Sequence, residues 1–357
     1  MIRGDWVNRF RYLFKDERGN VLVIFAVALI ALLGFAAIVI DVGGMYVERR
    51  SMVTAADAGA LAGARELAES GDEALAEQAA ALFAQTNGAE ITDDIEVLDV
   101  EYNGESFKAV RASVGVNREH FFAKALGFND SDVFARAVAT WGYPKALSNL
   151  LPIFFEIEDG QSLPEGEQLL LDESLEPGNW GFLALNPSGQ NAINAVLAGG
   201  VNDYEYEVGD EITQDTKPGN ANSRINPIEE RMRLAADPDS GVSMVGILPI
   251  IREITSGGRT EVVIVGFAPF LIKDVITAKT KEEDNLWYGR GSVYAHLENP
   301  PNYYGGYPMP QDIDEEFPKG AIIGEFLDQY FIPASQVGEI TQNPEFGFGT
   351  HVIRLVE

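Results

Sequence analysis

An uncharged apolar stretch near the N-terminus constrains this chain more than any other feature. Residues 21–40 contain no charged side chain, and 14 of these 20 residues are Val, Leu, Ile or Phe. At about 1.5 Å of rise per residue, a helix of this length crosses a hydrocarbon core of about 30 Å. The apolar region of a cleaved signal peptide is shorter, about 7–15 residues, and precedes a small-residue cleavage site. The stretch therefore predicts a permanent membrane-spanning helix.

The charges on either side of this stretch predict its orientation. Residues 1–20 carry five positive and three negative side chains, whereas the first charge after the stretch is Asp41. Positively charged flanks favour the cytoplasmic side of a membrane. We therefore expect a cytoplasmic N-terminus and an extracytoplasmic location for everything after Ile40. Arg49 and Arg50 weaken this contrast without reversing it.

The overall composition excludes several classes of function. The net charge is −29, so the chain repels nucleic acid, and we expect no nucleic-acid partner. Cysteine is absent, which rules out disulfides and thiolate metal sites within this sequence. The extracytoplasmic part must therefore be held by an apolar core, for which 46% hydrophobic residues are sufficient.

An alanine- and glycine-rich segment, residues 45–68, follows the apolar stretch and predicts a closely packed helix. Gly59 and Gly63 are spaced four residues apart, which lets two backbones approach each other. The partner of this small-residue face is open at this stage: it is either the β-structure of the same chain or another subunit. Gly43-Gly44 indicates a kink or hinge just outside the bilayer.

The segment up to residue 148 combines helices with a small antiparallel sheet. A second helix runs to about Gln85 after the break at Ser70-Gly71-Asp72. Asn103-Gly104 is a strong hairpin signal between two strands. The expected elements are strands at Ile95–Tyr102, Phe107–Val116 and Val133–Tyr143 and a short helix at Arg118–Leu126. A long N-terminal helix followed by a small antiparallel sheet is the layout of a pilin-like protein.

Short apolar runs separated by Gly, Pro and Asn predict a β-rich domain beyond about residue 149. Val242–Ile254 and Thr260–Ile272 read as a long hairpin, and Asn226-Pro227 reads as a helix start. The fold class is thus α+β, with a membrane helix that continues into a pilin-like helix packed on a small antiparallel sheet, followed by a β-rich domain. The expected divisions are a basic cytoplasmic segment at 1–20, the membrane helix at 21–40, the pilin-like unit at 41–148 and the β-rich extracytoplasmic domain at 149–357.

The block from Arg18 to Ala64 resembles the Tad (tight adherence) pilus-assembly family, the TadE/TadG-like proteins. The resemblance rests on the Arg18-Gly19-Asn20 start, the apolar stretch, the Asp41-Val42-Gly43 step, Tyr46, Arg49-Arg50 and the alanine-rich block with Asp57. Later stretches resemble parts of TadG-related proteins: Pro177–Phe182, Val208–Asp210, Lys217–Asn220, Val262–Phe267 and Pro269-Phe270.

The resemblance implies a structural component of a machine that builds adhesive surface pili, acting without catalysis or a cofactor. Its implied partners are pilin or assembly subunits at the helix 45–68 and the lipid bilayer at 21–40. Pilin precursors of such systems are typically cut after a glycine and carry Glu at the fifth mature position. Gly19 is present here, but the fifth following residue is Ile24. This departure favours a minor, accessory or anchoring role.

The candidate sites have plain structural interpretations beside functional ones. Asp41 sits where interfacial water can solvate it, and Asp57 either faces solvent or pairs with Arg49, Arg50 or Arg65. Asp237–Gly241 fails the calcium-loop pattern and reads as a turn. Glu282-Glu283-Asp284 reads as a solvated loop, and Tyr303, Tyr304 and Tyr307 as a surface loop. No metal ligands, cofactor-binding residues or catalytic residues are predicted.

Two other functions stay open at this stage. The outer domain could be a membrane-anchored ligand-binding or adhesin module. It could instead be a surface hydrolase, which would require His296 or His351 near a Ser or Asp in a cleft, because nucleophilic catalysis needs a base beside the nucleophile. His120 is the third histidine of the chain.

Overall fold

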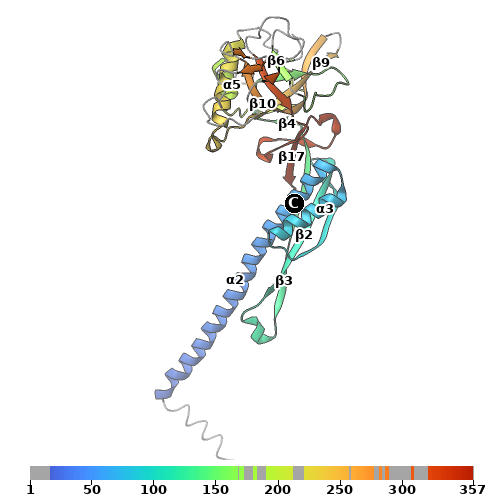
Figure 1. Ribbon diagram of the computed structural model, residues 1–357. Coiled ribbons are helices and arrows are strands. Elements are labelled where there is room, and N and C mark those ends of the chain that lie inside the picture. Colours follow the sequence, from blue (N-terminus) through green and yellow to red (C-terminus); the bar gives the residue numbers. More distant parts are fainter. Residues whose placement is uncertain are drawn as a thin grey trace, which may run out of the picture.

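The computed structural model describes most of the chain: a small sheet lies alongside the upper part of one long helix, and a second folded part lies beyond the end of that helix (Figure 1). It describes residues 17–167, 169–172, 180–182, 190–211, 221–256, 259–276, 281–283, 286–288, 307–308 and 321–356. Several stretches singled out in the sequence lie outside these residues: most of the basic flank (1–16), 177–179, 217–220, Asp284, His296, Tyr303 and Tyr304.

The first folded element is one uninterrupted helix, α2, that runs from Glu17 to Ser70 over 54 residues. It ends at Gly71, whose φ of +68° is the left-handed conformation that favours glycine. Helix α3 (Glu73–Thr86) then begins with Asp72 as its N-cap, and the Asp72 carboxylate accepts hydrogen bonds from the backbone N–H groups of Ala74 and Leu75. Both helices confirm the elements predicted from the sequence.

Six strands form the first sheet, in the order β1-β2-β3-β17-β15 with β16 also paired to β3. The predicted hairpin at Asn103-Gly104 is confirmed, since both residues have positive φ (50° and 82°), as a tight two-residue turn requires. The predicted helix at Arg118–Leu126 is mostly wrong, because β2 continues to Glu119 and only a 3-10 turn, η1 (Ala123–Leu126), follows. The strands are β1 (Ile91–Tyr102), β2 (Glu105–Glu119), β3 (Asp130–Pro144), β15 (Tyr330–Ile332), β16 (Ile340–Thr341) and β17 (Thr350–Leu355).

The C-terminal strands belong to this first sheet although they follow the outer domain in the sequence. Strand β17 pairs antiparallel with β3, from Val352 opposite Gly142 to Leu355 opposite Ala139. The division into domains at residue 149 stays a prediction, but β15, β16 and β17 do not follow it. We call α2 after residue 40, α3 and this sheet the stalk.

The outer part, which we call the head, is built on a second six-stranded sheet in the order β6-β14-β10-β9-β5-β7. The predicted long hairpin is confirmed as β9 and β10, with a register shift between Ile264 and Gly266. Helix α5 packs against β10 and β14. The elements are β5 (Ile153–Glu156), β6 (Leu169–Asp172), β7 (Trp180–Phe182), α4 (Gln190–Leu197), α5 (Ala221–Ala235), β9 (Val245–Ser256), β10 (Arg259–Ile276) and β14 (Ala321–Phe326).

Smaller elements complete the described part of the chain. Strands β4 and β8 pair with each other, and β11, β12 and β13 form a three-stranded sheet. They are β4 (Ala146–Leu147), β8 (Tyr206–Glu207), β11 (Lys281–Glu283), β12 (Leu286–Tyr288), β13 (Tyr307–Pro308), η2 (Pro238–Ser240), η3 (Ala334–Gln336) and η4 (Pro344–Phe346).

Several apolar cores hold the described layers together, and three of them are large. One lies inside the head and includes Phe270 and Phe326. The second lies between α2 and the stalk sheet and consists largely of alanine and valine. The third joins stalk to head, because Phe107 of β2 and Val352 of β17 share it with Phe267 of β10. The head is therefore attached to the stalk by a buried apolar contact as well as by the chain itself.

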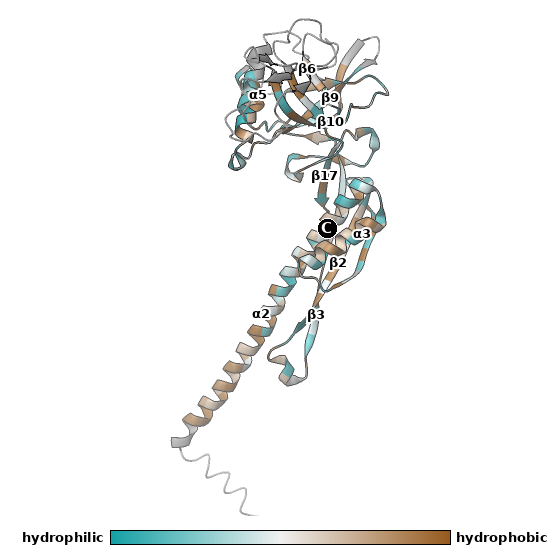
Figure 2. Ribbon diagram, in the orientation of Figure 1, coloured by the Kyte–Doolittle hydropathy of each residue, from teal (hydrophilic) through white to brown (hydrophobic). Residues whose placement is uncertain are grey.

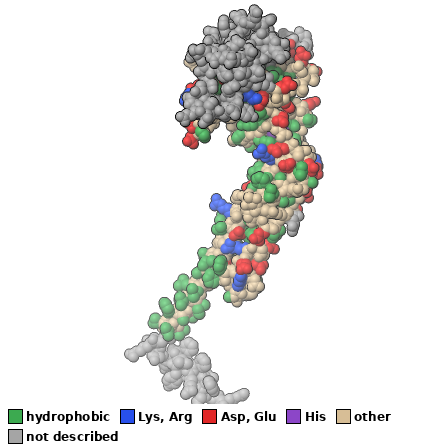
Figure 3. All heavy atoms as spheres, viewed as in Figure 1, with side chains coloured by type: hydrophobic (Ala, Val, Ile, Leu, Met, Phe, Trp, Pro, Cys, Tyr) green, Lys and Arg blue, Asp and Glu red, His purple; other side chains and the backbone are tan. Residues whose placement is uncertain are grey.

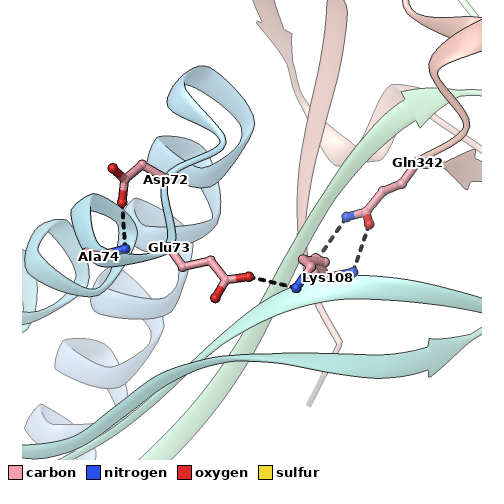
Figure 4. A network of polar contacts seen from close by, with 5 residues as sticks. All are labelled: Asp72, Glu73, Ala74, Lys108 and Gln342. Carbon is pink, nitrogen blue, oxygen red and sulfur yellow. Dashed lines mark hydrogen bonds and ion pairs between the residues drawn. The ribbon is translucent and has the colours of Figure 1, made fainter.

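A polar network fixes the C-terminal segment to the stalk (Figure 4). The Gln342 side chain accepts a hydrogen bond from the Lys108 backbone N–H at 2.8 Å and donates one to the Lys108 carbonyl at 2.9 Å. The same amide donates to the Trp141 carbonyl at 3.0 Å. The Lys108 ammonium forms an ion pair with Glu73 of α3 at 2.7 Å. Gln342 thus bonds to two strands just beyond the point where the pairing of β2 with β3 ends.

Candidate functional site on helix α2

The N-terminal part of α2 is an exposed apolar surface. Between Val21 and Val42 its large apolar side chains are exposed, and none of its most apolar window is buried. Figure 2 shows this part of the helix as continuously hydrophobic, and Figure 3 shows apolar side chains around it, whereas charges lie farther up. By length and composition this is a candidate membrane span, as the sequence predicted.

The small-residue face of α2 packs on its own chain. Ala55, Ala56, Ala60 and Ala64 are fully buried against the stalk sheet and α3. A Cβ placed on Gly59 would lie 2.9 Å from the Ala80 carbonyl oxygen, so the close approach requires glycine there. Of the two partners that the sequence left open for this face, the structure therefore shows the β-structure and α3 of the same chain.

Another face of α2 is largely exposed, although Asp57 at its upper end is half-buried. Tyr46, Arg50, Val53 and Asp57 are spaced by four, three and four residues and so share one side of the helix. Tyr46 is 72% exposed and Val53 is 41% exposed. In the part of the chain that the structure describes, neither the Arg50 guanidinium nor the Asp57 carboxylate has a hydrogen-bond or ion-pair partner. The pairing of Asp57 with an arginine of the same helix is therefore not seen.

Asp41 is buried by a distant part of the chain, with 8% of its surface exposed. Its carboxylate accepts hydrogen bonds from the backbone N–H groups of Phe121 (2.8 Å), Phe122 (3.0 Å) and Ala123 (2.8 Å). The expectation of a water-solvated Asp41 is wrong, because the connection between β2 and β3 returns to α2 and covers the carboxylate. No local signal could have revealed this contact, since the donors begin 80 residues later in the chain.

Two further contacts bind the β2–β3 hairpin to α2 above Asp41. Glu48 forms an ion pair with Arg118 at 2.9 Å, and the Arg49 guanidinium donates to the Phe134 carbonyl. A Cβ on Gly44 would collide with the Arg118 guanidinium, so this glycine makes room for the arginine. The helix continues through Gly43-Gly44 without a break, so the predicted kink or hinge is wrong. Gly44 is instead a position of close packing.

The histidines do not assemble a catalytic site among the described residues. His351 is buried between the rings of Trp141, Tyr143 and Phe331, and burial lowers the pKa of its imidazole. His120 Nε2 lies 2.9 Å from Ser131 Oγ, but its Nδ1 has no partner within the described part of the chain. A catalytic Ser–His pair needs a third group that orients the histidine ring, and among the described residues no such group bonds to His120 Nδ1.

The remaining candidates lie in ordinary structural positions. Asp237 caps the turn η2 by accepting a hydrogen bond from the Asp239 backbone N–H. The expected loops at Glu282-Glu283 and at Tyr307 are wrong, because these residues lie in strands β11 and β13. No group of three His, Asp or Glu side chains that could hold a metal ion occurs among the residues that the structure describes.

The arrangement fits a membrane-anchored protein in which one long helix carries both a candidate apolar span and the face on which a small sheet packs. Residues 19–66 match the family described as putative Flp pilus-assembly TadE/G-like (Tad), so the chain carries the Tad segment that its sequence indicated. This match coincides with α2 over nearly its whole length. No curated protein and no solved structure matches the chain.

Proposed function

We propose that this protein is a non-enzymatic accessory component of a Tad-type pilus assembly apparatus, acting as a minor pilin-like or anchoring subunit. The observation that carries the proposal is that different parts and faces of α2 have different surroundings. Its apolar part is free to enter a membrane, its small-residue face holds the stalk, and the face with Tyr46, Arg50, Val53 and Asp57 stays open. The Tad match covers these same residues.

The position of Ile24 supports an accessory role over that of a major pilin. A carboxylate in this part of an apolar helix would need a partner, because an unpaired charge in hydrocarbon is costly. Ile24 is instead one of the exposed apolar side chains of the span. Mass spectrometry of the mature protein tests this directly: an intact N-terminus supports permanent anchoring, and a start at Asn20 would show pilin-like processing.

The open face of α2 is the surface through which we expect pilus components to bind. A photo-reactive amino acid at Tyr46 or Val53 should crosslink to pilin or assembly subunits in native membranes. Leu75 on α3 is the matched control, because it is an exposed apolar residue outside this face. Equal crosslinking from Leu75, or no pilus component from either face, would contradict the proposal.

The proposed orientation places the N-terminus in the cytoplasm. Because the native chain has no cysteine, single-cysteine variants give an unambiguous readout. In right-side-out membrane vesicles, an impermeant maleimide should label Ser51→Cys at once and Asn8→Cys only after permeabilisation. The reverse pattern would overturn the orientation while leaving the anchor intact.

A further inference from the structure

The connection between β2 and β3 lies beside the part of α2 that we assign to the membrane. Figure 1 shows this connection reaching down along α2, away from the head. A groove of about 600 Å³ separates the two, lined by His120, Phe122 and Ala123 on one side. On the helix side its lining extends from Met45 down to Ala31. At about 1.5 Å per residue, Ala31 lies about 15 Å below Asp41, well within the apolar span.

Three phenylalanines of this connection are exposed. Phe121, Phe122 and Phe128 expose 73%, 47% and 65% of their surfaces. Transfer of phenylalanine side chains from water into an apolar medium is strongly favourable, and the three contributions act together. Phe122 lines the groove opposite α2, so its ring adjoins the exposed apolar surface of the helix, and a bilayer around α2 would meet the exposed rings of this connection as well.

Backbone N–H groups of the connection already have hydrogen-bond acceptors within the protein, as an environment poor in water requires. Asp41 accepts the N–H groups of Phe121, Phe122 and Ala123. Carbonyls within the connection accept those of Ala125, Gly127 and Phe128, at 3.0 to 3.1 Å. Because an unsatisfied N–H is strongly unfavourable in hydrocarbon, this bonding removes a main obstacle to insertion.

We propose that the β2–β3 connection, residues 120–129, is a second membrane contact of this protein. Its phenylalanines enter the bilayer leaflet nearest the head, Lys124 lies among the headgroups, and a lipid acyl chain fills the groove beside α2. The partner is thus lipid. Two contacts with one leaflet fix how the stalk is tilted and rotated relative to the membrane, which a single helix does not do. The proposal rests on the membrane anchor proposed above.

Depth-dependent quenching tests this in the full chain, reconstituted into phosphatidylcholine nanodiscs. A fluorophore on Ala125→Cys reports the connection and leaves its three phenylalanines in place. Ile30→Cys reports the anchor, and Ser106→Cys, near the β1–β2 turn, is the control in the stalk. We expect nitroxide groups on lipid acyl chains to quench the labels at positions 30 and 125 several-fold more than the label at 106.

Replacing Phe121, Phe122 and Phe128 by serine in the Ala125→Cys background should reduce quenching to the level at position 106. Quenching at position 30 but not at 125 would overturn the second contact and leave the anchor standing. Absence of quenching at position 30 would overturn both. A label at 125 that responds only to aqueous iodide would show that the connection faces water or another protein, against the proposal.

Discussion

Gly63 of α2 lies so close to Val110 of β2 that a Cβ on the glycine would come within 2.7 Å of the valine Cγ1. The same Cβ would lie 3.0 Å from the Ala76 carbonyl oxygen of α3. One glycine therefore sets the spacing of three elements: α2, α3 and the sheet. The small residues of the Tad segment serve here to bring the helix against its own stalk.

Enlarging Gly63 should destabilise the stalk. We expect Gly63→Val to lower the free energy of unfolding by about 1–3 kcal/mol, because the extra methyl groups have no space in the packed core. The matched control is Ala58→Val, at a less buried position of the same helix. Thermal unfolding in detergent measures both, and equal losses would show that the effect comes from valine in a helix, not from the contact with Val110.

Removing the Asp41 carboxylate should release the β2–β3 connection. In Asp41→Ala, three backbone N–H groups lose their charged acceptor, which favours local opening of residues 121–123. Hydrogen exchange of these residues in detergent should then accelerate by about tenfold or more, since exchange follows the free energy of local opening. Asp57→Ala, which removes a carboxylate without a partner among the described residues, should leave this exchange unchanged. Unchanged exchange in Asp41→Ala would mean that the carboxylate does not hold the connection.

Asp274 should make the head less stable as pH rises. Burial in β10 raises the pKa of its carboxyl group from 3.8 to about 6, and the charge of Glu229 acts in the same direction. The folded state therefore binds the proton more tightly than the unfolded state, so the contribution of this group to stability is highest below pH 4 and falls as pH rises to about 6. The loss is up to about 3 kcal/mol.

The variant Asp274→Asn should remove this pH dependence and stabilise the protein above pH 6. Urea unfolding between pH 4 and 8 measures the change. Asp239→Asn replaces an exposed carboxylate in η2 and is the control, which should keep the wild-type profile. A parallel profile for Asp274→Asn and the wild type would contradict the prediction.

The Gln342 side chain should be needed to hold the C-terminal segment. Gln342→Ala leaves the Lys108 N–H and the Trp141 carbonyl without this partner, and we expect a loss of about 1–2 kcal/mol in unfolding free energy. Gln329→Ala is the control, because within the described part of the chain its side chain makes one long hydrogen bond, of 3.5 Å, to the Glu69 carbonyl. A loss no larger than that of the control would show that the network in Figure 4 adds little.

The sequence predicts the elements whose signals are local. The apolar span, the hairpin at Asn103-Gly104 and the β9–β10 hairpin all depend on residues adjacent in the chain, and all are present. Helix α5 shows where a local signal fails. Asn226-Pro227 predicted its start, yet the helix begins by Ala221 and contains Pro227, with Ile228 and Met232 buried in the head core. Pro227 therefore lies inside the helix and not at its first position.

Other features that sequence reasoning missed depend on contacts between distant residues. Nothing near Asp41 indicates that the β2–β3 connection covers it, and nothing near Thr350 indicates that β17 pairs with β3. The sequence also left open which partner the alanine face of α2 contacts. Only the fold shows which part of the Tad segment is used internally and which face, from Tyr46 to Asp57, remains available.

The pairing of β17 with β3 has a consequence for the order of biogenesis. Translation proceeds from the N-terminus, so β3 is made long before β17, the strand that completes its sheet. Until β17 has been made, β3 presents an unpaired edge, which is the kind of edge to which another chain can add. The stalk sheet can therefore close only after the head, which lies between these two strands in the sequence, has been made.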